Sequence, residues 1–442
     1  MSNCMGPKNK RGELKKTLVR LSLFLLVTQV YYQSPVHYIE DSAYSLLMDE
    51  AILHQGTPNM IVYQVPHGTS LGFLNGYPGN IALVKGRLIY LFPWGSPILA
   101  LPGVAIANAL GYVVAPRYVY SGANETQMQE VFTTLLSGLI VCLVYEAAAA
   151  LLPVSWSLVI ALSVAFGTQM WSSVSRSLWP QTWYLCLIMV IILLLLRGWL
   201  RPAILATLLA WSGFVRPMAA PALLILGVFI LIELKSHWAR IIYLATGLLW
   251  AGLLGTMMLF FVGHLLAPVY GLQLGMVITG FGARLAGVLF SPSRGLLIYV
   301  PVVLVPLYLS ARYWRHLPQR RLAILALAEI FSTMVTLACC RIWWSGWSYG
   351  PRDLVETIPW LTLLTILGTK EFLDDSRMTM NRRVIMIGAA TLLLTVSVMM
   401  NAPGALSRTA NDWNATPNIN THPERLWDWR HAQFLSWMHR ID

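Results

Sequence analysis

The chain has 442 residues, of which 57% are hydrophobic and only 11% charged, and its mean hydropathy is +0.61. Soluble domains are about 45–50% apolar, so this composition excludes an ordinary soluble protein and indicates a membrane protein. The formal charge of +12 does not indicate nucleic-acid binding, because the Lys and Arg residues lie in short loops, where they report orientation in the membrane.

A basic segment, from Lys8 to Arg20, precedes the first apolar run and places the N-terminus in the cytoplasm by the positive-inside rule. Further basic clusters separate later apolar runs, which are long enough to cross roughly 30 Å of hydrocarbon. Placing every cluster on the cytoplasmic side predicts an all-α polytopic protein with about eleven spans. The predicted spans are 17–33, 131–151, 154–171, 182–197, 202–215, 219–234, 241–263, 296–311, 321–339, 354–369 and 384–401.

The first external loop is predicted to be long, from 34 to 130, and helical. Its apolar stretch 93–114 contains Pro102 and Gly103, which interrupt helices in lipid unless the freed backbone groups find partners. We therefore predict an interfacial or re-entrant element there, with a full crossing of the membrane as the alternative. The chain then consists of a transmembrane domain, 1–401, and a polar, Trp-rich external tail, 402–442.

Two adjacent acids, Glu40 and Asp41, follow the first predicted span. Carboxylates near a bilayer are costly and commonly functional. Asp41 has two interpretations: it caps the N-terminus of the following helix, or it is a general base that takes a proton from an acceptor hydroxyl. Glu40 could raise the proton affinity of the pair by repulsion, or the two could help to hold a divalent cation.

The helix after the acid pair is predicted from apolar residues at helical spacing. The spacing from Tyr44 to Ala51 marks one buried face, and Gly56 ends the helix. Asp49 and Glu50 fall on the opposite face and are predicted to be ordinary surface charges.

Several cations lie on the predicted external side, where the positive-inside rule disfavours them. A guanidinium grips phosphate oxygens with paired hydrogen bonds, so an anionic lipid phosphate would explain these exceptions. The alternatives are an ion pair with a neighbouring acid and snorkelling to the interface. The residues concerned are Arg176, Arg216, Arg294 and Arg352, with Lys85 as a weaker candidate.

Aromatic residues recur at the predicted external ends of the spans, among them Trp171, Trp347 and Tyr349. The usual interpretation is an interfacial belt. The alternative is that these rings stack on sugars or guide a prenyl chain.

Several short motifs resemble the GT-C class of polytopic glycosyltransferases, which take a sugar from a polyprenyl-phosphate donor on the periplasmic or lumenal side. The similarity is scattered over most of the chain and looks like a largely uncharacterised bacterial branch of the class. The motifs are Glu40-Asp41 followed by Tyr44, Phe166-Gly167-Thr168 with Trp171 and Arg176, Arg216-Pro217, Ser291-Pro292-Ser293-Arg294-Gly295, Trp347-Ser348-Tyr349-Gly350-Pro351-Arg352, and His422-Pro423-Glu424-Arg425-Leu426-Trp427.

The resemblance implies a role for individual residues. Asp41 resembles the catalytic base, with Glu40 as second choice, and Arg176 and Arg352 resemble ligands of the donor phosphate. Tyr44 and the three aromatic residues named above are then candidate substrate contacts. In one respect the chain departs from the class: the second loop acid that binds metal in oligosaccharyltransferases has no clear counterpart, so no cofactor is assigned and a divalent cation stays an open alternative.

The expected protein is therefore a glycosyltransferase of the bacterial inner membrane, with its active site and tail in the periplasm. Its partners would be a polyprenyl-phosphate-linked sugar, a glycan, lipid or protein acceptor, and membrane lipids, with no nucleic acid. Two rivals remain: a lipid-linked sugar flippase or secondary transporter, which should carry intramembrane ionisable residues and internal repeats, and a non-catalytic membrane scaffold.

Overall fold

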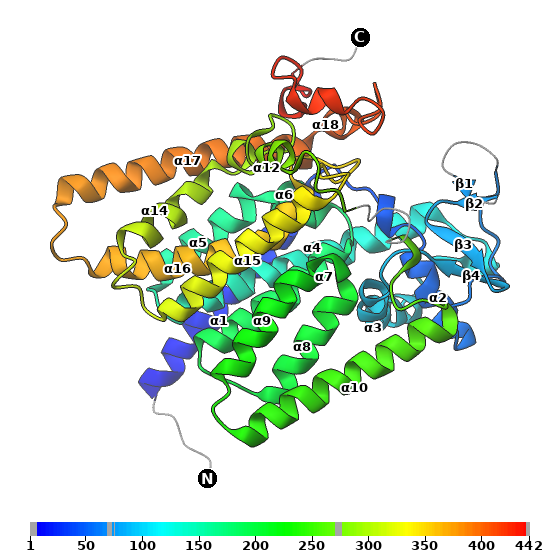
Figure 1. Ribbon diagram of the computed structural model, residues 1–442, viewed down its shortest axis with the longest axis horizontal. Helices are drawn as coiled ribbons and strands as arrows, with labels where there is room; N and C mark the ends of the chain where they lie inside the picture. The colour runs from blue at the N-terminus through cyan, green and yellow to red at the C-terminus, as the bar shows by residue number, and fades with distance from the viewer. Residues whose placement is uncertain (1–6, 69–72, 75, 270–275, 439–442) are drawn as a thin grey trace.

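The computed structural model describes residues 7–68, 73–74, 76–269 and 276–438 and is predominantly helical (Figure 1). The last four residues of the predicted tail, 439–442, lie outside the described residues. Each of the eleven predicted spans overlaps a helix, although 296–311 is divided among a short helix, a 3-10 turn and α14. These helices are α1 (Pro7–Gln33), α4 (Gly122–Ala149), α5 (Val154–Gly167), α7 (Pro180–Leu196), α8 (Pro202–Val215), α9 (Ala220–Glu233), α10 (His237–Phe261), α14 (Leu304–Arg312), α15 (Arg320–Cys339), α16 (Ile358–Asp374) and α17 (Met380–Leu406).

Four helices of the described part are long and apolar enough to cross a membrane: α4, α10, α15 and α17. The number rises to six if each of two bent helix pairs counts as one span. These pairs are Val154–Gly167 with Gln169–Arg176, bent by 45°, and Pro202–Val215 with Pro217–Glu233, bent by 119°. Pro217 accounts for the second break, because proline cannot donate the backbone hydrogen bond that would continue the helix. The chain is thus a helical membrane protein, and the count of eleven spans stays a prediction.

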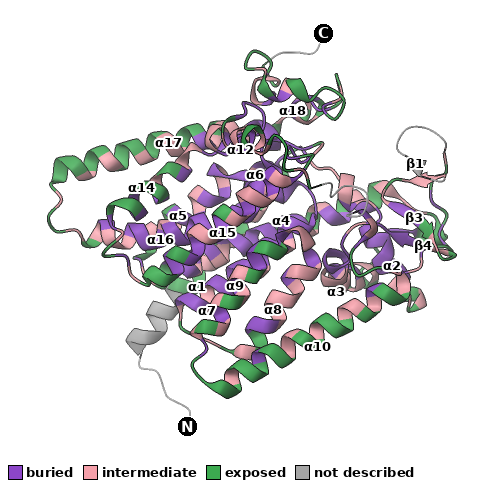
Figure 2. Ribbon diagram, in the orientation of Figure 1, coloured by how far each residue is buried: buried purple, intermediate pink, exposed green. Residues whose placement is uncertain are grey.

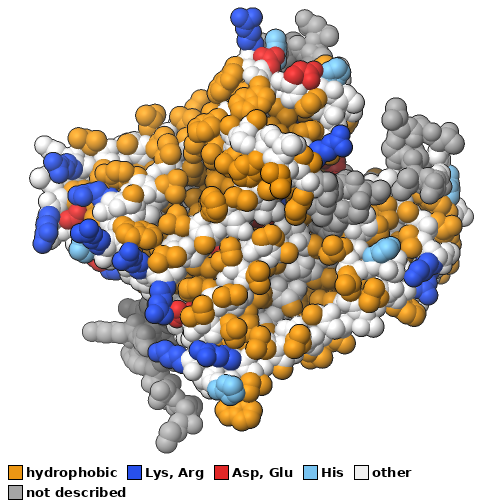
Figure 3. Space-filling model, viewed as in Figure 1, with side chains coloured by type: hydrophobic (Ala, Val, Ile, Leu, Met, Phe, Trp, Pro, Cys, Tyr) orange, Lys and Arg blue, Asp and Glu red, His pale blue; other side chains and the backbone are white. Residues whose placement is uncertain are grey.

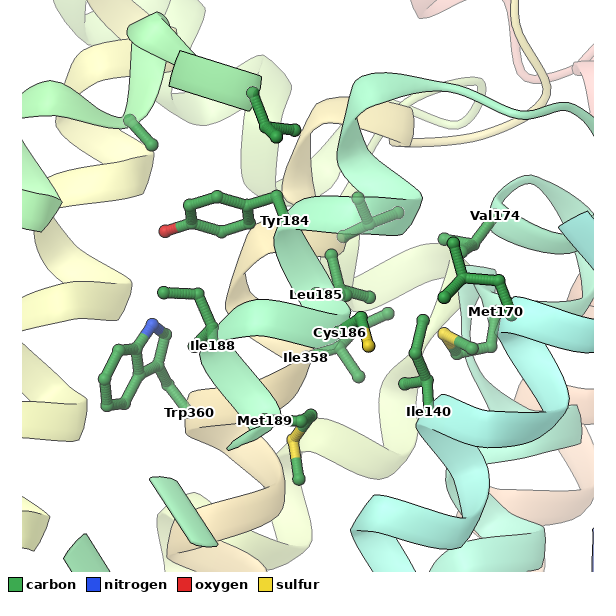
Figure 4. Close-up of a cluster of buried hydrophobic side chains, with 14 of the residues drawn as sticks. Ile140, Met170, Val174, Tyr184, Leu185, Cys186, Ile188, Met189, Ile358 and Trp360 are labelled. Atoms are coloured by element: carbon green, nitrogen blue, oxygen red, sulfur yellow. The ribbon is translucent and has the colours of Figure 1, made fainter. Parts of the chain in front are cut away.

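The core of the bundle forms where α4, α7 and α16 meet. Figure 4 shows Tyr184 and Ile188 of α7 between Ile140 of α4 and Trp360 of α16, and all four side chains are at most 1% exposed. By contrast, α10 and α17 lie at the edges of the bundle with mostly exposed surfaces (Figure 2). Only 6% and 11% of the most apolar windows of α10 and α17 are buried. Their bare apolar faces are what a helix shows to lipid, where every backbone polar group is satisfied within the helix.

The loop 34–130 packs beside one end of the bundle and is not purely helical as predicted. It contains two helices, α2 (Ser45–Gln55) and α3 (Gly95–Ala109), and two antiparallel hairpins that the sequence analysis missed. The hairpins pair β1 (Phe73–Leu74) with β2 (Tyr77–Pro78) and β3 (Ile81–Val84) with β4 (Arg87–Tyr90). Lys85 and Gly86 join β3 to β4 with φ angles of 50° and 76°, the left-handed conformation that a two-residue hairpin turn favours. The helix expected within 93–114 is α3, and its place relative to the membrane stays a prediction.

The predicted buried face of α2 is confirmed, since Tyr44 and Ala51 at its two ends are 7% and 0% exposed. The helix ends at Gly56, whose φ of 67° suits glycine. The interpretation of Asp41 as its N-cap is wrong, because Asp41 lies in a preceding 3-10 turn, Glu40–Ser42. Glu125 of α4 caps α2 instead: its carboxylate accepts the backbone N–H groups of Tyr44 and Leu46 at 2.8 and 2.9 Å.

The prediction that Asp49 and Glu50 are surface charges is also wrong. They are 0% and 1% exposed, because α3 and the segment after it cover that side of α2. Glu50 accepts the Val114 backbone N–H and the Asn108 side-chain amide, both at 2.9 Å. Burial raises the pKa of Asp49 well above its usual range, and the nearby Glu125 and Glu50 raise it further.

The remaining short elements connect the bundle helices or build the tail. The tail begins as α17 ends, and its Trp413 is buried, whereas Trp427, Trp429 and Trp437 are exposed. These elements are α6 (Gln169–Ser172), α12 (Phe281–Phe290), α13 (Leu296–Tyr299), α18 (Arg408–Asp412), and the 3-10 helices η2 (Pro116–Tyr118), η3 (Val174–Arg176), η4 (Pro217–Ala219), η5 (Pro301–Val303), η6 (Arg352–Thr357), η7 (Pro423–Trp427) and η8 (Gln433–Leu435).

Candidate functional site

The acid pair lies in the 3-10 turn Glu40–Ser42, between α1 and α2. The hairpin β3–β4 holds this turn from one side. The Tyr90 hydroxyl donates to the Asp41 carbonyl, and the Asn80 amide donates to the Glu40 carbonyl, both at 2.6 Å. Since these bonds use the backbone of the turn, both carboxylates are left for other partners.

Asp41 forms an ion pair with Arg352 at the start of η6. Arg352 Nη1 lies 2.9 Å from Asp41 Oδ2, and the side chains are 10% and 38% exposed, respectively. The guanidinium lies over the Trp179 ring, 4.3 Å from its centroid, and Nη2 donates to the Ser345 carbonyl at 3.0 Å. Within the described part of the chain the buried Nε of Arg352 has no hydrogen-bond partner. A buried guanidinium with an unused donor next to a half-exposed carboxylate is suited to bind an anion.

Glu40 has an unusual proton affinity. Burial is the main reason that the pKa of its carboxyl is raised to about 7. The charge of Asp41 also raises this pKa, whereas Arg352 and the side chain of Asn411 lower it. The Tyr38 phenol lies nearby, and burial followed by the charge of Glu40 raises its pKa. A carboxyl that titrates near neutral pH can accept or release a proton under physiological conditions.

Behind Arg352 lies a buried network centred on Arg216, at the break between α8 and α9. Arg216 contacts Asp353 at 2.8 Å and Glu356 at 2.5 Å, so both its carboxylate partners come from η6. Burial alone would raise the pKa of Asp353, but Arg216 and Arg352 together hold it below its usual value. Gln181 also donates to Asp353 at 3.0 Å. This network fixes η6, and with it Arg352, against the bundle.

Arg176 lies near the acid pair in the chain fold but is directed elsewhere. It is 1% exposed, and its guanidinium donates to the backbone carbonyls of Tyr31, Ser34 and Val36 at 2.7–3.2 Å and to the Ser175 hydroxyl. The Arg176 carbonyl in turn accepts the Tyr38 backbone N–H at 3.2 Å. With its donors used in this way, Arg176 ties the end of α1 to η3 and thereby positions the segment that leads to Glu40.

Arg294 fastens the tail to the bundle. It is 2% exposed and donates to the side-chain oxygens of Asn414 and Gln433 and to the Trp344 carbonyl. Lys85 lies apart from both arginines, in the exposed turn of the hairpin β3–β4, at the opposite end of β4 from Tyr90. The structure therefore brings only Arg352, of the predicted phosphate ligands, into direct contact with an acid of the pair.

The predicted aromatic contacts are mostly engaged in packing. Tyr44 stacks on Tyr120 with ring centroids 4.4 Å apart, and the buried Tyr349 donates its hydroxyl to the Met400 carbonyl. Trp171 donates to the Ser34 hydroxyl at 3.1 Å. Trp347, which is 39% exposed, is the most accessible of the predicted group.

Sequence reasoning missed Trp179 and Asn411 as neighbours of the acid pair. Trp179 was visible only as one of several aromatic residues, and Asn411 lies in the tail, whose folding against the loop no local pattern predicts. The network around Arg216 had one signal in the sequence: Asp353, an acid on the external side, directly follows Arg352. An acid in that place indicates that a buried cation lies nearby.

No group of three or more His, Cys, Asp and Glu side chains in the described ranges is arranged to hold a metal ion. Glu40 and Asp41 could supply two carboxylate ligands, but Arg352 already lies on Asp41. The chain matches no protein-family model, and a search of curated proteins finds no match either.

Proposed function

We propose that this protein is a membrane glycosyltransferase, similar to the GT-C class, that moves a sugar from a polyprenyl-phosphate donor to an acceptor hydroxyl. The observation that supports this most strongly is the contact of Asp41 with Arg352, which joins a proton acceptor to an anion-binding group. The proposal includes about eleven spans in the bacterial inner membrane, a cytoplasmic N-terminus, and a site and tail on the periplasmic side.

The proposed reaction inverts the anomeric centre. The Asp41 carboxylate takes the proton of the acceptor hydroxyl while that oxygen forms a bond to the anomeric carbon. The bond between this carbon and the phosphate oxygen breaks, and its electron pair leaves with the polyprenyl phosphate. The guanidinium of Arg352 stabilises the charge that develops on the leaving phosphate, as pre-arranged donors do in other group transfers.

Glu40 and Trp179 have supporting roles in this proposal. Glu40, with its pKa near neutrality, exchanges a proton with Asp41, so that turnover depends on pH around 7. The Trp179 ring orients the guanidinium of Arg352 by a cation–π contact. In this proposal the other three arginines do not bind the donor phosphate. Arg176 positions the backbone before Glu40, Arg216 holds η6, and Arg294 holds the tail.

A secondary transporter or lipid-linked sugar flippase is the second candidate, and one residue favours it. Glu329 of α15 is fully buried, and it has no ion pair with any described residue. An acid inside a membrane helix is costly and is commonly part of a substrate or proton pathway. Uptake of a lipid-linked or free sugar by proteoliposomes, abolished by Glu329→Gln and unaffected by Asp41→Asn, would favour this alternative.

The experiment that tests the proposed function is incubation of the purified protein with a panel of radiolabelled polyprenyl-phosphate sugars. We expect release of polyprenyl phosphate from at least one donor, with sugar transferred to an added acceptor or to water. Absence of turnover with every hexosyl and pentosyl donor, in membranes that contain the folded protein, would contradict it.

A further inference from the structure

A large, mostly apolar cavity lies among the helices of the bundle. It has a volume of about 340 Å³, is partly open, and is lined by α5, α14, α16 and α17 together with neighbouring segments. Thr168 lines one end and Phe372 the other, and Ala390 and Leu394 of α17 form one wall. Neither acid of the pair nor Arg352 is among the lining residues.

The position of this cavity indicates that its occupant is hydrocarbon. The wall formed by α17 belongs to a candidate span of 27 residues, of whose most apolar window only 11% is buried. The outer surface of α17 is exposed along much of its length (Figure 2). The lining is mostly aliphatic and aromatic, with several threonines among it, and the solvent beside a membrane-spanning helix is the lipid tail region. The acyl chain of a membrane lipid therefore suits this cavity.

One end of the cavity adjoins a cationic surface. Phe372, which lines that end, lies under Arg383, whose guanidinium carbon is 5.7 Å from the ring centroid. The Tyr313 hydroxyl donates to Asp375 at 3.0 Å, so the end of α14 meets the turn between α16 and α17 here. Figure 3 shows Lys and Arg side chains gathered along this edge of the molecule, at the left of the view.

Positive charge outnumbers negative charge at this edge even after the local ion pairs are counted. Three acids lie there, Glu371, Asp374 and Asp375, and Asp374 is already paired with Lys370 at 2.8 Å. The cations are twice as many: Arg312, Arg315, Lys370, Arg377, Arg382 and Arg383. An anionic headgroup with a hydrocarbon chain complements this combination of a basic rim and an apolar cavity.

We propose that an anionic glycerophospholipid binds here, with one acyl chain in the cavity and its phosphate at Arg383. The lipid comes from the leaflet on the basic side of the membrane. It is distinct from the sugar donor, because Arg352 precedes the opposite end of α16. A helix of 17 residues spans about 25 Å, so a headgroup at Arg383 does not reach the acid pair. The inference is independent of the proposed glycosyl transfer.

The bound lipid would connect α17 to the rest of the bundle. Near Gly167 of α5, Leu394 of α17 already packs against the bundle, and an acyl chain in the cavity would extend this apolar contact along α17. Because α17 leads directly into the tail, the lipid would also stabilise α18, the tail helix whose Asn411 side chain interacts with Glu40.

The test uses the full-length protein purified in a mild detergent, with retained lipids identified by native mass spectrometry. We expect one retained glycerophospholipid per chain, with phosphatidylglycerol or cardiolipin enriched at least about fivefold over the bulk membrane. Ala390→Phe fills the cavity and should abolish retention. Ala389→Phe, one residue away on the exposed surface of α17, is the matched control and should retain the lipid.

Arg383→Gln tests the headgroup separately, in case the cavity-filling variant fails to fold. It should keep a bound glycerophospholipid but lose the enrichment of anionic headgroups, whereas the exposed Arg382→Gln should keep that enrichment. Equal lipid retention by Ala390→Phe and Ala389→Phe would overturn the proposal. So would a wild-type protein without retained lipid, a retained isoprenoid in place of a glycerophospholipid, or unchanged headgroup preference in Arg383→Gln.

Discussion

Asp41 and Arg352 are 311 residues apart in the sequence, and their side chains meet at 2.9 Å. Asp41 is held by the hairpin β3–β4, and Arg352 by the buried network of Arg216 and η6. Each member is thus fixed by a separate part of the fold, as a site that must keep its geometry requires.

The role of Asp41 as proton acceptor predicts a loss of turnover without a loss of folding. Asp41→Asn keeps the size of the side chain but removes its basicity, so we expect transfer of labelled sugar to fall by about 10²–10⁴-fold. The elution profile of the protein on size exclusion should stay unchanged. Asp374→Asn, which alters an exposed acid of α16 paired with Lys370, should leave transfer at the wild-type rate. Full activity of Asp41→Asn would remove this residue from the mechanism.

The raised pKa of Glu40 predicts a pH-dependent effect on stability. The pKa is 4.5 for an unperturbed glutamate and about 7 in the folded protein, so the folded state binds more protons than the unfolded state between these values. Stability from this group is present at low pH and is lost as the pH rises towards 7. Glu40→Gln should therefore unfold at nearly the wild-type temperature at pH 5 but at a higher temperature at pH 8. Thermal unfolding followed by intrinsic fluorescence checks this, and a higher unfolding temperature at pH 5 alone would contradict it.

Arg176 should be required for folding and not for binding of the donor. Arg176→Gln leaves buried carbonyls at the end of α1 without partners, and we expect it to lose on the order of 3 kcal/mol of unfolding free energy. Arg176→Lys should not restore it, because an ammonium group lacks the planar fork that reaches several carbonyls. The yield of monodisperse protein and its thermal unfolding measure this. A stable Arg176→Gln variant with weakened donor binding would support the original assignment to the donor phosphate.

The tail should be released when its buried anchor is removed. Asn414 accepts from Arg294 at 2.7 Å and donates to the Ser348 carbonyl at 3.0 Å. Asn414→Ala leaves both groups without these bonds, so trypsin should cut the tail at least about tenfold faster than in the wild-type protein. Asn381→Ala, an exposed amide on α17, is the control. Equal cleavage rates in the two variants would show that the tail is held by other contacts.

The helices and the acid pair could be predicted because their signals are local. The apolar runs between basic loops overlap the long helices of the bundle, and the spacing from Tyr44 to Ala51 predicted the buried face of α2. The hairpins were missed because β1 and β2 have only two residues each, too few for a periodic pattern. The surface prediction for Asp49 and Glu50 failed because the residues that bury them, from α3 to Val114, lie far along the chain.

The individual roles of the arginines could not be predicted from the sequence. Four arginines were selected because they lie on the predicted external side. Only the tertiary structure shows that Arg176 donates to a carbonyl of α1, whereas Arg352 forms an ion pair with Asp41. The capping of α2 by Glu125 was hidden for the same reason. A buried polar group takes whichever partner the fold brings to it.

The most direct test of the central claim is the dissociation constant of a polyprenyl-phosphate sugar for the wild-type protein and two variants. If Arg352 holds the phosphate and Asp41 accepts the proton, Arg352→Gln should weaken donor binding by about 10–100-fold. Asp41→Asn should bind the donor at least as tightly as the wild-type protein, although it does not turn over. Unchanged binding by Arg352→Gln, or loss of binding in Asp41→Asn, would contradict the account.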